Sequence, residues 1–266
     1  MIYCNLFPGG RTKALTLSYD DGAPEDLRLL ELMRKWGIKG TFNLNASRIS
    51  SEAVRDNYVG FEVAVHGYTH PFLQMMPSDM MAREIALDRA TLEEAAGYPV
   101  RGMAYPYGTY NEKVIEQLRA LGIVYSRTVV STRDFRLPAN YLEWHPTCHH
   151  DDPELWKLCD RFLNEKTRDP HRVFYLWGHS FEFERKNNWE RIEQFCEKMA
   201  GHDDIWYATN MEIYEYIDAS NRLVTSCDGY IVYNPSAIDV WVSKDARWNT
   251  SGEKVCIPAG QTLRFK

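Results

Sequence analysis

The chain has 266 residues, of which 44% are hydrophobic and 26% charged, a composition typical of an ordinary soluble globular protein. Its formal net charge of -6 argues against a nucleic-acid partner, because no basic field would attract phosphate. No apolar stretch reaches the ~20 residues that a membrane span needs, so no membrane association is expected.

The amino-terminal sequence contains no basic segment followed by a long apolar stretch, so it does not predict a secretory signal. The six cysteines are scattered without a CxxC pair, which favours reduced thiols over a disulfide framework. Both features predict a cytoplasmic protein, and neither indicates an oligomeric state.

Short β-prone runs alternate with helical patterns from the amino terminus to residue 218. The expected strands cover residues 14–19, 40–44, 61–65, 102–105, 124–127, 172–177 and 205–208. The expected helices cover residues 25–36, 78–96, 111–121, 189–199 and 211–217. Repeated βα units imply a parallel sheet, and the length fits a barrel whose catalytic groups lie at the carboxyl ends of its strands.

The helical pattern disappears after residue 218, where short strands at 230–233, 240–242 and 262–265 are separated by turn sequences. The expected fold is therefore α/β: a distorted (β/α) barrel of parallel strands with a small carboxyl-terminal antiparallel β appendage. We expect the barrel to span residues 1–218 and the appendage, packed on it, residues 219–266.

Asp20 and Asp21 follow the first strand of the barrel and precede Gly22, which allows a sharp turn. Two adjacent carboxylates repel each other unless a positive group lies beside them. The pair is equally compatible with a turn that caps the following helix.

His66 and His70 follow the third expected strand at a spacing of four residues. Combined with Asp21, they would form an open site with three protein ligands, suited to one divalent ion. Zn²⁺ is the expected ion, with Co²⁺ and Ni²⁺ as alternatives.

Two further segments end expected strands. Pro106, Tyr107 and Gly108 form a tight-turn sequence, and His179 follows an apolar strand. A histidine with a pKa near 6.5 is a natural general acid at neutral pH, although a histidine that only caps the strand would fit the same pattern.

The order of these four segments resembles the polysaccharide deacetylases, the NodB-homology enzymes of carbohydrate esterase family four. Their T-F-D-D-G motif corresponds to residues 17–22, and their H-[ST]-x-x-H motif to residues 66–70, with Gly67 in place of Ser or Thr. Their R-x-P-[YF]-G motif is matched by residues 106–108, and their Leu-His strand end by residues 175–179. The resemblance covers about residues 14–210.

The resemblance implies a role for each matched residue. Asp20 corresponds to the general base, and Asp21, His66 and His70 correspond to the metal ligands. Tyr107 corresponds to the residue whose backbone N–H helps to hold the oxyanion, and His179 corresponds to the general acid.

Three positions depart from the family pattern. Ala104 stands where the family's Arg supports the base, and Arg101 is the nearest replacement in the sequence. The Asp–Trp motif that orients the acid has no clean match, with Asp134 and Trp144 as partial candidates. Gly178 makes the strand before His179 one residue longer than usual.

Aromatic and basic residues beside these motifs could contact a sugar: Tyr105, Trp144, Trp177 and Arg101. A histidine-rich segment, residues 145–152, could hold a second metal, but a loop near the site is the favoured interpretation.

The sequence thus predicts a metal-dependent hydrolase that removes acetyl groups from an N- or O-acetylated sugar or glycan. One alternative is a hydrolase of a cyclic amide or ureide, similar to allantoinase. The other is a carbohydrate-binding protein whose catalysis has decayed.

Overall fold

The computed structural model describes residues 2–165, 171–244 and 252–265. The strands of the large sheet are β2 (Lys13–Asp20), β3 (Gly40–Leu44), β4 (Glu62–Val65), β5 (Gly102–Ala104), β6 (Tyr125–Arg127), β7 (Cys148–His149), β8 (Arg172–Gly178) and β9 (Ile205–Tyr207). The helices around it are α1 (Asp26–Lys35), α2 (Ser51–Asn57), α3 (Ser78–Ala96), α4 (Glu112–Ala120), α5 (Leu155–Asn164), α6 (Phe181–Arg185), α7 (Trp189–Met199) and α8 (Asn210–Asn221).

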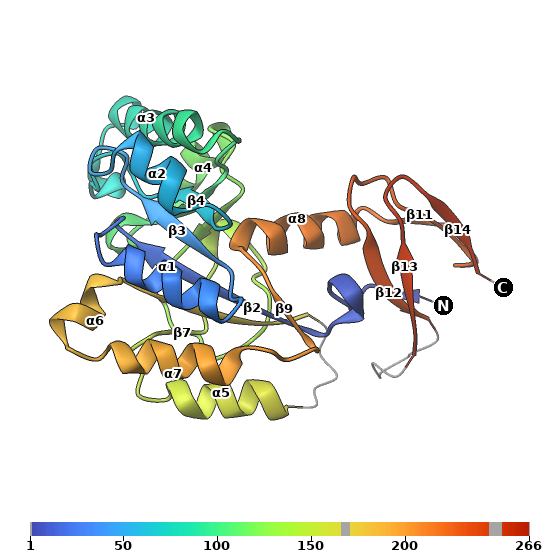
Figure 1. The fold of residues 1–266 in the computed structure, drawn as a ribbon. Helices are drawn as coiled ribbons and strands as arrows, with labels where there is room; N and C mark the ends of the chain where they lie inside the picture. The colour runs from blue at the N-terminus through green and yellow to red at the C-terminus, as the bar shows by residue number, and fades with distance from the viewer. Residues whose placement is uncertain (1, 166–170, 245–251, 266) are drawn as a thin grey trace.

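The large sheet is parallel throughout, in the order β6-β5-β4-β3-β2-β8-β7, with β9 paired to the first half of β2. The central strand β2 is buried along all eight residues, as expected for a strand that is covered on both faces. Its neighbours β3 and β8 are likewise buried at every position. Helices lie on the outside of this curved sheet (Figure 1).

One segment connects the two outer strands of the sheet. Trp144 exchanges backbone hydrogen bonds with β6, its N–H donating to Ser126 and its carbonyl accepting from Thr128. A few residues later, β7 pairs with β8. The sheet is therefore curled into a half-barrel closed by residues 144–149, which confirms the predicted distorted barrel.

Two small antiparallel sheets complete the chain. One contains β1 (Ile2–Tyr3), β12 (Val240–Lys244) and β13 (Glu253–Ile257), and the other β10 (Val224–Thr225), β11 (Ile231–Tyr233) and β14 (Thr262–Arg264). Figure 1 shows both chain ends at these sheets. The antiparallel appendage is as predicted, but β1 contributes to it from the amino terminus, so its first sheet combines both ends of the chain.

Packing explains why the sequence pattern identified helices such as α1 and α4 but not the two short helices α2 and α6. Helix α1 buries Leu29, Leu30 and Met33 on one face, and α4 buries Val114, Ile115 and Leu118. In contrast, α2 buries only Val54 and α6 only Phe183, so neither short helix has a periodic apolar face that would reveal it. None of the helices in the described residues has the length and apolar composition to cross a membrane.

Candidate active site at the carboxyl end of the parallel strands

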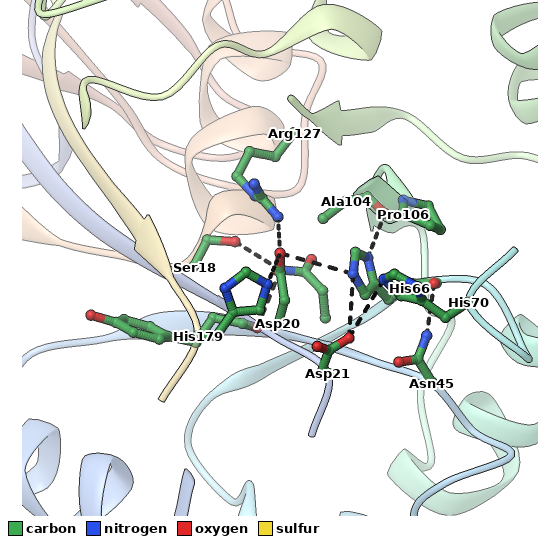
Figure 2. Close-up of polar contacts among 12 residues, drawn as sticks. Ser18, Asp20, Asp21, Asn45, His66, His70, Ala104, Pro106, Arg127 and His179 are labelled. Carbon is green, nitrogen blue, oxygen red and sulfur yellow. Dashed lines mark hydrogen bonds and ion pairs between the residues drawn. The ribbon is translucent and has the colours of Figure 1, made fainter. Parts of the chain in front are cut away.

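The motifs identified in the sequence meet at one edge of the sheet. Asp20 is the last residue of β2, and Asp21 follows it. His66 directly follows β4, and His179 directly follows β8. Because β2, β4 and β8 are parallel, their carboxyl ends bring these side chains together, as Figure 2 shows.

The side chains of Asp21, His66 and His70 converge on a common point. The Oδ1 atom of Asp21 lies 3.7 Å from His66 Nε2 and 3.6 Å from His70 Nε2. This oxygen is buried and has no hydrogen-bond partner among the described residues. His66 Nδ1 lies 2.8 Å from the carbonyl oxygen of Ala104, which can only accept, so Nδ1 carries the proton and the lone pair of Nε2 faces Asp21.

This donor set fits a divalent ion of the Zn²⁺ class, since it offers two imidazole nitrogens and one carboxylate oxygen and leaves positions open. Burial lowers the pKa of His66 to about 4, more than the nearby Asp20 and Asp21 raise it. Burial also lowers the pKa of His70. Both rings are therefore in the neutral form that metal binding requires at neutral pH.

The backbone at this site adopts left-handed conformations at several positions. Asp21, His70 and Tyr107 have φ angles of 78°, 61° and 58°, a region that costs a non-glycine residue of order 1–3 kcal/mol. Gly67 has a φ of 76°, and a Cβ atom there would lie 3.1 Å from Pro71 and 3.3 Å from Pro106. A side chain at this position would be strained and would crowd both prolines, which explains why Gly67 replaces the Ser or Thr of the family motif.

Two residues that the sequence analysis missed hold the loop of His66. The amide of Asn45 donates to the carbonyl oxygens of His66 and Gly67, at 2.8 and 2.7 Å. The carboxylate of Asp88, from α3, accepts from the backbone N–H of His66 at 2.9 Å and of Ala46 at 2.7 Å. Asn45 directly follows β3 and Asp88 lies in α3, and neither residue belongs to the four motifs that the sequence analysis identified.

Asp20 is buried beside a cation that was not predicted to lie there. The guanidinium of Arg127, the last residue of β6, forms an ion pair with Asp20 Oδ2, and the amide of Asn43 donates to Asp20 Oδ1 at 2.9 Å. Burial by itself would raise the pKa of Asp20, but Arg127, followed by His66 and His179, outweighs it and holds the pKa below its usual range. Asp20 is thus ionised at neutral pH.

The interpretation of Arg101 as the group that supports Asp20 is wrong. The Arg101 guanidinium lies 3.9 Å from Glu215 of α8 and is 40% exposed. Arg101 precedes β5, so it lies at the amino end of the strands, whereas Arg127 ends β6 and reaches the site from a neighbouring strand.

His179 lies between two carboxylates. Its Nε2 is 3.9 Å from Asp20 Oδ2, and its Nδ1 is 3.6 Å from Oε2 of Glu182 in α6. Burial lowers the pKa of His179, but Glu182 and then Asp20 outweigh burial, and the pKa is raised above its ordinary value. Glu182, rather than Asp134, is the carboxylate beside Nδ1; Asp134 pairs with Arg136 and Arg172.

Tyr107 lies at the open side of the site. Its ring is in edge contact with His70, with centroids 4.3 Å apart, and it stacks on Phe72 at 3.9 Å. Tyr107 and Phe72 are 53% and 43% exposed. The predicted oxyanion role of its backbone N–H stays a prediction.

Two of the aromatic residues predicted to contact substrate are core residues instead. Tyr105 is buried and its hydroxyl donates to the carbonyl oxygen of Leu142 at 2.7 Å. Trp144 is buried against Tyr125 and Tyr175. Large aromatic rings are more often buried in the core than exposed, and both follow that rule. The centroid of the Trp177 ring lies 4.4 Å from the Arg127 guanidinium, so Trp177 helps to hold the arginine that pairs with Asp20.

The histidine-rich segment lies beside the site, as predicted. His145 contacts Thr128, with Nδ1 2.6 Å from Oγ1. His149 and His150 lie at the end of β7 and each approach Glu182 Oε2 to 3.0 Å. The segment is therefore a strand that closes the barrel, not only a solvated loop.

Comparison with known proteins agrees with this geometry. A peptidoglycan-N-acetylglucosamine deacetylase of Listeria monocytogenes is 26% identical over 129 residues, which are 47% of this chain and 27% of that protein. The alignments with the first three curated relatives span only 18 to 47% of their own length.

Two solved structures share the fold. A peptidoglycan deacetylase of Bacillus subtilis superposes with a TM-score of 0.52 and 17% identity, over 77% of this chain and 92% of that chain. An allantoinase superposes with a TM-score of 0.63 and 16% identity, over 78% of this chain and 90% of that chain.

The sequence model of the polysaccharide deacetylases matches residues 9–126, a region that includes Asp20, Asp21, His66, His70 and Tyr107. The chain is thus similar to the polysaccharide deacetylases over that region, and its three candidate metal ligands lie within it.

Proposed function

We propose that this protein is a metal-dependent hydrolase that removes acetyl groups from an N- or O-acetylated carbohydrate. One observation carries the proposal: an ionised carboxylate, a histidine with a raised pKa and three candidate metal ligands surround the same point. Members of the family act on acetylated carbohydrates, and these groups are the ones that such a hydrolysis needs.

A divalent ion held by Asp21, His66 and His70 would supply Lewis-acid chemistry, polarising the acetyl carbonyl and lowering the pKa of a water molecule. Asp20 would accept the proton of the attacking water, and its ion pair with Arg127 supports this role because it keeps the carboxylate ionised. Arg127 in turn is fully buried and fixed by Trp177, so the base has a defined position.

His179 would then protonate the departing amine or alcohol. Its Nε2 atom faces Asp20, while its Nδ1 atom faces Glu182, which favours a proton on both nitrogens. The backbone N–H of Tyr107 would donate to the developing oxyanion, a contribution of roughly 3–4 kcal/mol in comparable sites.

Acetate release from N-acetylglucosamine oligomers and acetylated xylan tests this proposal. The metal-stripped protein would be assayed with Zn²⁺, Co²⁺ or Ni²⁺ added back. We expect release that depends on the added ion, an Asp20→Asn variant slower by about 10²–10⁴-fold, and no detectable release from His66→Ala. His202→Ala is the matched control and should retain full activity, because the ring nitrogen Nε2 of His202 lies 3.0 Å from the carbonyl oxygen of Lys198 and outside the candidate site.

Two outcomes would contradict the proposal. Hydrolysis of cyclic ureides without acetate release would favour the alternative that the allantoinase fold suggests. Binding of both an ion and a glycan without any turnover would identify a decayed, carbohydrate-binding member of the family.

A further inference from the structure

A second group of potential metal ligands lies outside the site of Asp21, His66 and His70. It consists of His149 and His150 at the end of β7, the adjoining Asp151, and Glu182 of α6. Their ligand atoms all lie within 4.8 Å of one another. We call these four residues the second histidine cluster.

The His150 ring packs against Tyr19 and Phe183, but these contacts leave its nitrogens unsatisfied. It is 1% exposed, and neither of its ring nitrogens has a hydrogen-bond partner in the described parts of the chain. Its Nε2 atom is 3.0 Å from Glu182 Oε2, yet the direction of the contact does not satisfy hydrogen-bond geometry. A buried imidazole without a partner is costly, and such exceptions require an explanation.

The same signature marks the first site. There, Asp21 Oδ1 is a buried atom without a hydrogen-bond partner among the described residues, 3.6 to 3.7 Å from two imidazole nitrogens. Two ligands that bind one ion both point at the ion rather than at each other. Close nitrogen–oxygen contacts that are off the hydrogen-bond direction are therefore what an ion-binding pair would show.

Backbone contacts fix the His150 ring in this position. Its N–H donates to the carbonyl oxygen of Trp177 at 2.9 Å, and its own carbonyl accepts from Arg191 Nε at 2.7 Å. The ring lies directly against the backbone of Gly178, where a Cβ atom would be 2.1 Å from Nδ1. The glycine that lengthens the strand before His179 is thus the residue that admits His150.

The four residues are not equivalent as ligands. The backbone N–H of Asp151 donates to His149 Nδ1 at 3.1 Å, so a neutral His149 carries its proton on Nε2 and has no lone pair there to offer. His149 Nε2 lies 3.0 Å from Glu182 Oε2 and orients that carboxylate. The available donors are therefore His150 Nε2, Glu182 and Asp151.

The charges around these donors favour a nitrogen-binding ion. Asp151 already contacts Lys186 and lies 3.7 Å from Arg191, so much of its charge is compensated. A hard oxygen-seeking ion such as Ca²⁺ would find too few carboxylate oxygens here, whereas imidazole suits Zn²⁺, Co²⁺ and Ni²⁺.

We propose that His150, Asp151 and Glu182 bind a second divalent transition-metal ion, separate from the ion of Asp21, His66 and His70. Glu182 adjoins His179 as well, at 3.6 Å from Nδ1, so the second ion lies behind the candidate acid. The proposal concerns ion binding and does not depend on the substrate or on any activity.

Metal stoichiometry tests it directly. The purified chain would be stripped with a chelator, loaded with Zn²⁺ and desalted, and its zinc content measured by mass spectrometry. We expect two zinc ions per chain for the unmodified protein, one for His150→Ala, one for His66→Ala and none for the double variant. His202→Ala should retain two, because its ring lies on Lys198 O and outside both clusters.

A Glu182→Gln variant keeps the side-chain volume and should also retain one ion, which guards against loss of zinc by misfolding of His150→Ala. Thermal unfolding of each variant would show that the fold is intact. One ion in the unmodified protein that disappears in His66→Ala would overturn the proposal, as would two ions that both persist in His150→Ala. Failure to release acetate would not affect the proposal of a second ion, because the proposal concerns ion binding alone.

Discussion

Glu62 at the amino end of the half-barrel and Asp21 and His150 at the carboxyl end differ in how their buried polar atoms are satisfied. At the amino end, Glu62 accepts from Thr41 at 2.7 Å, from Tyr125 at 2.6 Å and from the backbone N–H of Met211 at 2.9 Å. Both of its oxygens are therefore engaged within the protein. This arrangement ties the first turn of α8 to the strands of the sheet.

At the carboxyl end, polar atoms are buried without such completion. Asp21 Oδ1 and the ring nitrogens of His150 lack hydrogen-bond partners in the described chain, and left-handed backbone occurs at Asp21, His70 and Tyr107. Fully satisfied polar groups stabilise a fold, whereas strained backbone and unsatisfied polar groups persist where function retains them. The comparison separates Glu62, whose oxygens are satisfied within the fold, from Asp21 and His150, whose buried polar atoms are not, and four variants test the contacts at the two ends.

The largest effect is expected at Arg127. An Arg127→Gln variant leaves the buried Asp20 carboxylate without its cation, which should lower the free energy of unfolding by about 3–5 kcal/mol. Urea denaturation measures this change. Arg101→Gln is the matched control, because its contact with Glu215 is exposed and should contribute less than about 1 kcal/mol. Equal losses in the two variants would contradict the assignment of Arg127.

Glu62 offers a pH-dependent test at the amino end. Burial raises the pKa of Glu62 from 4.5 to about 7, so its neutral form is favoured in the folded state. Its contribution to stability is complete below pH 4.5, declines as the pH rises through about 7, and then changes no further.

Glu62→Gln removes this titration. Between pH 4.5 and 8, the unfolding free energy of the variant should therefore gain on the unmodified protein by on the order of 3 kcal/mol. Parallel urea titrations at several pH values measure the difference, in which the other buried carboxyls cancel. A difference that is independent of pH would show that Glu62 is ionised throughout.

Gly178→Ala tests the close packing at the carboxyl end. The new Cβ atom would lie 2.1 Å from His150 Nδ1, so the ring must move, at a cost of about 1–3 kcal/mol in unfolding free energy. Gly201→Ala provides a comparison, since nothing lies within 4 Å of a Cβ there and only the backbone cost at a φ of 73° remains. If the zinc content and stability of Gly178→Ala both match the unmodified protein, the His150 ring is not held as described.

Tyr105→Phe should have the smallest effect. It leaves the buried carbonyl oxygen of Leu142 without its partner, which costs about 0.5–1.5 kcal/mol in unfolding free energy, and KM for an acetylated sugar should not change. Thermal denaturation and steady-state kinetics measure the two quantities. An increase in KM with unchanged stability would restore the predicted contact between Tyr105 and substrate.

The sequence by itself determined the class of the fold and the candidate metal ligands. Asp20, Asp21, His66, His70 and His179 each follow or end an apolar strand, and parallel strands bring their carboxyl ends together whatever the details of packing. The apolar faces of α1 and α4 could also be predicted, because their apolar residues recur at helical spacing in the sequence. These features are local in sequence, and a repeated βα order converts them into one place in space.

Only the tertiary structure decided which side chains complete the site. Arg127 reaches Asp20 across 107 positions of sequence, and the choice between Arg127 and Arg101 depends on which end of a strand each occupies. His149 and His150 meet Glu182 because the closing segment of the barrel lies beside β8, a pairing with no local signal. Tyr105 and Trp144 look like sugar-binding aromatics in sequence, but burial assigns them to the core. Strand order and side-chain burial arise from contacts between distant segments, and a linear pattern cannot specify them.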